Sequence, residues 1–313
     1  MKERVLITGG AGYIGSILAQ ILLEYDYNVT VIDNLYYKQE SSLNHLFIHD
    51  RFEFVRGDVR VEGDILPLLK KADVIIPLAA LVGAPICDLD PVGATTTNRD
   101  AIFFMMKNIS KEQRIIMPTT NSAYGSGDKN NFCTEESPLN PISRYAKDKV
   151  EVEEALMQHP NAISMRLATV FGMSPRMRID LLVNDFVHRA VKDGFIVLFE
   201  PHFKRNYIHV RDVGRAFLHA MNKFDDMRGN IYNIGLDSAN LSKMELCERI
   251  KLQLPNFTYM VAEGKKDPDQ RNYIVSNEKI KSTQWMPIYD IDRGIKELIS
   301  GYKFVRNNRH GNV

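Results

Sequence analysis

A tyrosine and a lysine four residues apart, Tyr145 and Lys149, have the side chains and the spacing for acid–base chemistry. On a helix, residues four apart share a face, so the Lys149 ammonium can lie beneath the Tyr145 phenol. A phenol has a pKa near 10, and bringing that pKa to about 7 takes roughly 4 kcal/mol of preference for the phenolate. A neighbouring ammonium supplies part of that preference. Such a phenolate could act as a general base, a role typically worth about 10²–10⁴ in rate.

The spacing of Tyr145 and Lys149 is common by chance, since average lysine usage gives about one such pair among the 13 tyrosines of this chain. An exposed helical tyrosine and lysine are therefore the alternative interpretation. The position of the pair favours chemistry, because Pro141, Ile142 and Ser143 open the helix and a β-rich run at 114–117 precedes it. The elements around the pair thus decide its meaning.

Short β-rich runs alternate with helical patterns through the first half of the chain. The strand runs are apolar nearly throughout, as expected for parallel strands covered on both faces. We predict strands at 4–8, 28–33, 52–55, 73–76, 114–117 and 163–167, and helices at 13–25 and 101–106. The helix at 101–106 is apolar on every face, which favours burial against the sheet on one side and against a second subunit on the other. The pattern predicts an α/β protein with a doubly wound parallel sheet.

The pattern changes after about residue 169. Helices are predicted at 181–192, 213–224 and 243–254, and strands at 196–199, 207–210 and 231–234. No linker-like segment separates the two halves. We therefore predict a larger domain at 1–168 and a smaller α/β C-terminal lobe at 169–313 that is interleaved with it.

Three glycines, Gly9, Gly12 and Gly15, follow the first predicted strand and open the first helix. Glycine here permits a tight turn, close approach of the backbone to a pyrophosphate and close packing of the helix on the strand, and the helix N-terminus attracts the anion. Asp33 ends the second strand, where a carboxylate can accept hydrogen bonds from a ribose and would repel a 2′-phosphate. A turn-forming aspartate before Asn34 is the alternative for Asp33. Together these residues predict a Rossmann-type domain that binds NAD rather than NADP.

Composition and charge exclude other classes. The 313 residues are 44% apolar and 25% charged with a net charge of +1, which argues against disorder and gives no basic surplus for nucleic acid. Cys87, Cys133 and Cys247 lack the spacing of a disulfide framework or zinc site, and the eight histidines have no metal-ligand spacing, so no metal is expected. Without a signal peptide or a membrane-spanning run, we expect a cytoplasmic protein that binds small molecules and no membrane.

The spacing Gly-x-x-Gly-x-x-Gly and the Tyr145–Lys149 pair together resemble the extended branch of the short-chain dehydrogenase/reductase superfamily, whose members act on nucleotide-activated sugars. The resemblance runs from Gly9 to about Ile295, although Pro77 stands where family members usually have histidine. It implies that NAD is bound by the glycines, Asp33, Tyr145 and Lys149 together with Tyr13, Ile14, Asn34, Asp58, Val59, Leu78, Ala79, Ala80 and Asn98.

The segment 119–125 is similar to the family segment that ends in Tyr-Gly. This match implies that Thr120 hydrogen-bonds the reacting hydroxyl and completes the catalytic set with Tyr145 and Lys149. Asn121 and Ser122 stand where the 4,6-dehydratases of the family carry Asp-Glu, so dehydratase activity is not expected. The segment also lacks the cysteine of the carbon-3/5 epimerases.

For the substrate, the resemblance implies contacts from both halves of the chain. Thr169 replaces the usual asparagine of the segment that crosses from cofactor to substrate, and Arg271 belongs to a late motif, 269–273, whose arginine clamps the diphosphate. The implied substrate residues are Val82, Asn121, Ser122, Thr169, Arg178, Asn184, Arg205 and Arg271.

Within the family, the chain is most similar to bacterial enzymes that modify GDP-manno-heptose for surface and capsule polysaccharides, including a 4-dehydrogenase. We therefore expect a homodimeric oxidoreductase that transfers hydride from carbon 4 of a nucleotide-diphosphate sugar to NAD, with Tyr145 as the base. A 4-epimerase that uses the same 4-keto intermediate is the alternative. A redox-sensing regulator would be expected to have lost Tyr145 and Lys149, and both are present.

Overall fold

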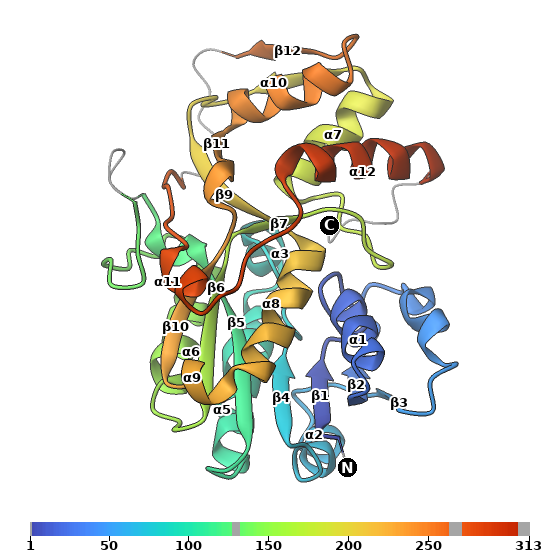
Figure 1. The fold of residues 1–313 in the computed structure, drawn as a ribbon, viewed down its shortest axis with the longest axis vertical. Coiled ribbons are helices and arrows are strands. Elements are labelled where there is room, and N and C mark those ends of the chain that lie inside the picture. Colours follow the sequence, from blue (N-terminus) through green and yellow to red (C-terminus); the bar gives the residue numbers. More distant parts are fainter. Residues whose placement is uncertain (1, 127–131, 263–270, 306–313) are drawn as a thin grey trace.

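The computed structural model describes residues 2–126, 132–262 and 271–305 (Figure 1). Its main element is a seven-stranded sheet in the order β10-β6-β5-β4-β1-β2-β3, in which all neighbouring strands run parallel. The strands are β1 (Arg4–Thr8), β2 (Asn28–Asp33), β3 (Phe52–Arg56), β4 (Val74–Pro77), β5 (Arg114–Thr120), β6 (Ala162–Leu167) and β10 (Asn230–Ile234). The predicted Rossmann-type parallel sheet is confirmed.

Helices cover both faces of this sheet and close an apolar core on each. On one face lie α1 (Gly15–Glu24), α8 (Val210–Asn222) and the 3₁₀ turn η1 (Glu40–Leu46). On the other lie α2 (Glu62–Leu69), α5 (Ala101–Asn108) and α6 (Arg144–Leu156). Strand order reverses between β1 and β4, and in such sheets ligands bind at the carboxyl ends of the strands beside this point. The glycine turn and the loop after β4 both lie there.

The second half of the chain completes the sheet and adds a smaller lobe. Strand β10 pairs with β6, and α8 packs on α1. The remaining strands form a three-stranded sheet, β11-β9-β7, and a parallel pair, β12-β8, which lie at the upper end of the molecule in Figure 1 with α7, α10 and α12. The elements of the lobe are β7 (Thr169–Phe171), α7 (Leu182–Lys192), β8 (Phe195–Leu198), β9 (Lys204–His209), η4 (Asp237–Ala239), β11 (Asn240–Ser242), α10 (Lys243–Gln253), β12 (Thr258–Val261) and α12 (Ile291–Phe304). The short helices α9 (Phe224–Met227) and α11 (Glu278–Ser282) pack instead against α8 and β10, beside the main sheet.

The segment from 84 to 108 is more helical than predicted. It forms α3 (Ala84–Leu89), α4 (Pro91–Thr95), a π-helical turn η2 (Thr96–Asp100) and then α5. Asp90 caps α4 by accepting a hydrogen bond from the Gly93 amide at 2.8 Å, and Pro91 suits the first helical turn because its missing N–H would be unpaired there anyway.

Helix α5 is covered by the sheet on one side only within this chain, and contact of its other side with a second subunit stays a prediction. Ile102 and Met105 are buried against the sheet, whereas Phe103 is 37% exposed. None of the helices in the described ranges is long and apolar enough to cross a membrane.

Candidate active site

Helix α6 carries the tyrosine and the lysine. Ser143 caps the helix, since its hydroxyl accepts a hydrogen bond from the Ala146 amide at 3.2 Å. Tyr145 is half-buried and packs against a small apolar cluster that includes Leu81 and Cys87, on the loop after β4 and on α3. The helix therefore presents the phenol towards the carboxyl end of the sheet.

Lys149 lies one turn further along α6 and is only 4% exposed. Its Nζ donates a hydrogen bond to the carbonyl oxygen of Pro118 on β5 at 3.3 Å. Burial lowers the pKa of Lys149 to about 8, while the neighbouring Asp148 carboxylate raises it. Lys149 is thus a positive charge held close to the strand end.

The electrostatics of Tyr145 differ from the expectation. Burial raises the pKa of the Tyr145 phenol to about 12, and the charges that oppose this rise are the guanidinium groups of Arg178 and Arg271. The protein's own groups therefore shift the pKa away from neutrality, not towards it. Burial was not visible in the sequence, and for a phenol it penalises the charged form.

Thr120 ends β5 and is buried, and its Oγ1 accepts a hydrogen bond from the Ser122 amide at 3.1 Å. The 3₁₀ turn η3 (Asn121–Tyr124) follows directly and packs against α6. Arg271, from the C-terminal half, donates from Nη1 to the Ser122 hydroxyl. Thr120, Lys149 and Arg271 are thereby brought to one end of the sheet.

Asn121 stands out in this turn because its side chain is fully buried and, among the residues that the structure describes, neither its Oδ1 nor its Nδ2 has a hydrogen-bond partner. Buried amides are nearly always paired, and an unpaired donor or acceptor costs about 1–3 kcal/mol.

The glycine turn between β1 and α1 approaches the loop after β4. Gly9 has φ +67°, and a Cβ atom there would lie 2.6 Å from the Cα of Ala79. The Ala79 amide also donates to Thr8 Oγ1 at 3.2 Å. Only glycine permits this approach to Leu78 and Ala79, and contact of Leu78, Ala79 and Ala80 with the cofactor stays a prediction.

Asp33, at the end of β2, accepts hydrogen bonds from the amides of Ala11 at 3.0 Å and Leu35 at 2.8 Å. Burial raises the pKa of this carboxyl group, while the two amides and the Arg176 charge oppose the rise. Beside it lies a pocket lined by Ala11, Gly12, Asp33, Leu35, Tyr37, Gln39 and Arg176. Glycines at the turn and a carboxylate at the pocket wall fit the pyrophosphate and the adenosine ribose of NAD.

The sequence reasoning named only Gly12 and Asp33 of this pocket as cofactor residues and missed its other lining residues, among them Tyr37 and Arg176. The Arg176 guanidinium lies over the Tyr37 ring, 4.2 Å from its centroid, and burial lowers the pKa of Arg176 to about 10. Tyr37 and Arg176 come from opposite halves of the chain, and no spacing rule joins them.

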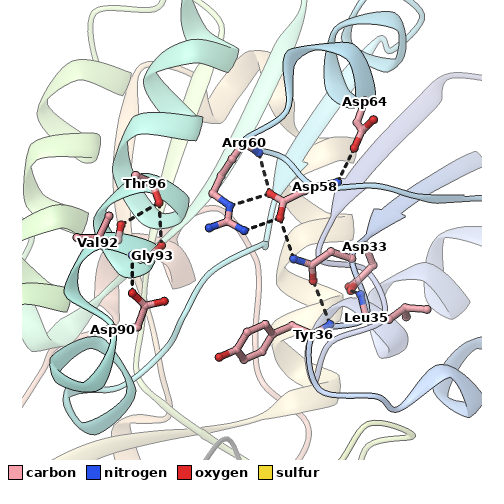
Figure 2. A network of polar contacts seen from close by, with 11 residues as sticks. Asp33, Leu35, Tyr36, Asp58, Arg60, Asp64, Asp90, Val92, Gly93 and Thr96 are labelled. Atoms are coloured by element: carbon pink, nitrogen blue, oxygen red, sulfur yellow. Dashed lines mark hydrogen bonds and ion pairs between the residues drawn. The ribbon is translucent and has the colours of Figure 1, made fainter.

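Asp58, a predicted cofactor residue, is held in a polar network (Figure 2). The Arg60 guanidinium donates to both of its carboxylate oxygens, at 2.9 and 2.6 Å, and lowers the pKa of Asp58 to about 2. Asn34 Nδ2 donates to the same carboxylate at 3.1 Å, and Asp64 accepts from the Asp58 amide at 2.9 Å. Val59, next in the chain, is buried in the core. The network fixes the loop after β3 beside Asp33.

Several predicted contact residues point into the protein. Asn98 is fully buried, and its amide donates to and accepts from the backbone of Leu81, at 2.9 and 2.8 Å. Asn184 accepts from the Gly172 amide at 3.0 Å and donates to the Tyr13 hydroxyl at 3.2 Å. Tyr13 in turn donates to the Gly172 carbonyl at 2.7 Å, and Ile14 is half-buried where α1 begins. These side chains hold the loops of the site in place.

The predicted substrate residues Thr169 and Arg178 lie near the start of the C-terminal half of the chain. Arg178 forms an ion pair with Asp180 and donates to the carbonyl oxygen of Val82 at 3.4 Å, and its charge reaches Tyr145. Thr169 is half-buried at the start of β7.

Arg205 lies further inside: it is buried, donates to the Lys204 carbonyl and lies 5.7 Å from the centre of the Tyr273 ring. Residues 269 and 270 of the late motif lie outside the described ranges. Across residues 2–126, 132–262 and 271–305, no three His, Cys, Asp or Glu side chains are grouped so that they could hold a metal ion.

The geometry can be compared with known proteins. A model of the NAD dependent epimerase/dehydratase family matches residues 5–235. The chain belongs to this family. Membership confirms the expected cofactor, NAD, and an enzyme of the epimerase/dehydratase type.

Relatives of this family member span its whole length. A putative UDP-glucose 4-epimerase of Methanocaldococcus jannaschii is 26% identical over an alignment of 321 positions, which covers 97% of this chain and 99% of that protein. UDP-glucuronic acid decarboxylase 3 of Arabidopsis thaliana is 30% identical over an alignment of 320 positions, which covers 97% of this chain and 90% of that protein. The structure of UDP-glucuronic acid 4-epimerase from Bacillus cereus, in complex with UDP-glucuronic acid and NAD, is 22% identical with a TM-score of 0.84, covering 96% of this chain and 99% of that one. The last comparison shows the shared fold.

Proposed function

We propose that this enzyme oxidises the carbon-4 hydroxyl of a nucleotide-diphosphate sugar. The observation that carries the proposal is that two arginines from the second half of the chain reach the segments around Tyr145. Tyr145 packs against Leu81, and Arg178 donates to the carbonyl of the next residue, Val82. Arg271 donates to the Ser122 hydroxyl in the turn after Thr120, and both arginine charges favour the Tyr145 phenolate. A phenol beside two guanidinium groups suits a substrate that carries a reacting hydroxyl near a diphosphate, because guanidinium binds phosphate oxygens with paired hydrogen bonds. The names of the relatives, which act on UDP-sugars, support the same class.

In this proposal each residue has a separate role. Tyr145 takes the proton of the substrate hydroxyl, Thr120 hydrogen-bonds the same hydroxyl, and Lys149 supplies positive charge to the phenolate and holds ribose hydroxyls. NAD, when bound, supplies the hydride acceptor and a positive charge that favours the phenolate. The glycine turn and Asp33 hold its pyrophosphate and adenosine ribose.

The two parts of the chain divide this work. We assign NAD binding to residues 1–168 and sugar-nucleotide binding to 169–313, with Val82, Asn121 and Ser122 reaching the substrate from the first part. Asn98 and Asn184 act through the loops they hold, since their amides are satisfied inside the protein.

Two outcomes of carbon-4 oxidation are distinguishable. If the keto sugar turns over and takes hydride back on its other face, the enzyme is a 4-epimerase, and the relatives named as 4-epimerases support this outcome. If the keto sugar leaves, the enzyme is a 4-dehydrogenase. The resemblance to enzymes of GDP-manno-heptose and the presence of Thr169 in place of asparagine support that outcome.

We also propose a homodimer in which the uncovered face of α5 is part of the interface. Phe103 is exposed there, and Phe104 and Met106 are half-buried. Sedimentation of the wild type and of Phe103→Glu measures this directly: a monomeric wild type contradicts the proposal.

Turnover of a panel of nucleotide sugars tests the function. The purified enzyme is incubated with NAD and with GDP-manno-heptose, UDP-glucose or UDP-glucuronic acid, and product NMR is followed together with the absorbance of NADH. Inversion at carbon 4 without an isolable keto sugar identifies an epimerase, and a 4-keto sugar with equimolar NADH identifies a dehydrogenase. Failure to turn over or bind any sugar nucleotide contradicts the proposal.

A further inference from the structure

A charge pair is buried beneath the catalytic helix. Glu153 of α6 and Arg166 of β6 are each 3% exposed. Arg166 donates from Nη2 to Glu153 Oε1 at 2.6 Å and from Nε to both carboxylate oxygens at 3.0 and 3.2 Å. Neither residue has a part in the proposed chemistry, so the pair needs a separate explanation.

The Glu153 carboxylate also binds two hydroxyl groups. Its Oε2 accepts from Thr119 Oγ1 at 2.8 Å and from Ser164 Oγ at 2.6 Å. Thr119 lies directly before Thr120 on β5, and Ser164 lies on the neighbouring strand β6. The buried charge is therefore fully hydrogen-bonded, and each bond ties α6 to the strands beneath it.

Arg166 extends the network to the far side of the strand end. Its Nη1 donates to the Tyr124 hydroxyl at 3.0 Å and to the Glu135 carbonyl at 3.1 Å. The Tyr124 hydroxyl donates to Asn233 Oδ1 on β10 at 2.7 Å. Tyr124 ends η3, the turn that begins with Asn121, so the same pair holds both α6 and the turn after Thr120.

The contacts follow a regular arrangement. Tyr145, Lys149 and Glu153 are spaced by four residues along α6 and so share one face. Lys149 bonds Pro118 and Glu153 bonds Thr119, which are the two residues before Thr120 on β5. Successive turns of the helix are thus fastened to successive residues of the strand.

We propose that Glu153 and Arg166 are positioning residues that set the distance between the Tyr145 phenol and the Thr120 hydroxyl, an inference that rests on the proposed function of that site. A buried ion pair is often no more stabilising than an apolar pair of the same volume, but its hydrogen bonds have fixed directions. Directional anchoring matters here, because a displacement of about 1 Å can cost about 10²-fold in rate.

The test uses paired variants. The double variant Glu153→Leu/Arg166→Met removes both charges together, so no unpaired charge stays buried. Thr119→Val removes only the hydroxyl that reaches Glu153, and Thr119→Ser keeps it. Val187→Ala, a buried position on α7 far from these contacts in sequence, serves as a control for lost stability.

Activity and the ionisation of Tyr145 are measured in each variant. We expect kcat to fall about 10–100-fold in the double variant and less in Thr119→Val, with KM changed less than threefold and with recovery in Thr119→Ser. The pKa of Tyr145, from ultraviolet titration against Tyr145→Phe, should fall in the double variant because a loosened helix admits water. Val187→Ala should lower the unfolding temperature without either change.

The outcomes separate the two proposals. An unchanged kcat and an unchanged Tyr145 pKa in a folded double variant overturn the positioning role while the function stands. A shifted Tyr145 pKa in an enzyme that turns over no nucleotide sugar supports the positioning role and contradicts the function.

Discussion

Lys149 donates a hydrogen bond from Nζ to the carbonyl oxygen of Pro118 at 3.3 Å. Pro118 lies two residues before Thr120 on β5. The bond joins α6 to β5 and is made by an almost fully buried ammonium. Burial lowers the pKa of this group to about 8 from its ordinary 10.5. Burial at the strand end therefore makes this charge unfavourable in the folded protein.

This cost predicts how stability depends on pH. Between about 8 and 10.5 the unfolded chain binds the Lys149 proton and the folded protein does not, so stability rises with pH across this window. From pH 8 to pH 10.5, the free energy of unfolding of the wild type should therefore rise by about 2–3 kcal/mol more than that of Lys149→Met. Urea unfolding of both proteins at several pH values measures the difference, in which other titrations cancel. A difference that does not change with pH contradicts the buried charge.

Tyr145→Phe should leave the fold unchanged and remove the base. We expect kcat to fall about 10²–10⁴-fold, the usual contribution of a general base. Because burial raises the pKa of Tyr145, the wild-type rate should increase with pH through the neutral range, and the residual rate of the variant should not. Steady-state kinetics across pH measure both. Tyr27→Phe, which removes a hydroxyl that donates to Asn222 Oδ1 at the surface, is the matched control.

The elements that follow from local rules could be predicted from the sequence. The apolar runs at 4–8 and 28–33 coincide with β1 and β2, and the Ser143 cap fixes the start of α6 close to its predicted position. These features depend on neighbours along the chain: strand periodicity, glycines at a turn and a capping hydroxyl.

Features that depend on burial or on distant segments could not be predicted. The sequence led us to expect a lowered pKa for Tyr145, but the structure buries the phenol, and burial raises its pKa more than the charges of Arg178 and Arg271 lower it. Asn98 was predicted to contact the cofactor, and in the structure both polar atoms of its side-chain amide are hydrogen-bonded to the backbone of Leu81. A motif position gives the residue type, and only the tertiary structure gives the direction of the side chain.

Asn121 gives the third prediction, because its fully buried amide has no hydrogen-bond partner within the described parts of the chain. Asn121→Leu removes the unpaired groups at similar volume, so the free energy of unfolding should stay the same or rise by up to about 2 kcal/mol. If the substrate forms hydrogen bonds with the Asn121 amide, kcat/KM should nevertheless fall at least about tenfold in Asn121→Leu. Chemical unfolding and steady-state kinetics give the two numbers.

The same substitution at Asn98 provides the contrast. Its amide is satisfied by Leu81, so Asn98→Leu should lose about 2–4 kcal/mol of stability. An Asn121→Leu variant that is destabilised as much as Asn98→Leu would show that Asn121 is paired within the protein. One that is stable and fully active would remove Asn121 from the substrate site.

Comparing Gly9→Ala with Gly194→Ala separates two effects on stability: the steric clash at the glycine turn and the strain of a positive φ. Both have positive φ, +67° and +69°, so alanine at either position carries a similar conformational cost of about 1–2 kcal/mol. At Gly194 a Cβ atom meets nothing within 4 Å, whereas at Gly9 it would lie 2.6 Å from the Cα of Ala79. Gly9→Ala should therefore lose about 1–3 kcal/mol more stability than Gly194→Ala, since backbone must move to relieve the clash.

The same displacement should weaken NAD binding in Gly9→Ala, because the turn that approaches the pyrophosphate is moved, and leave it unchanged in Gly194→Ala. Thermal unfolding and calorimetric titration with NAD measure the two effects on both variants. Equal losses of stability together with equal NAD affinity would mean that the contact between the turn and Ala79 does not shape the cofactor site.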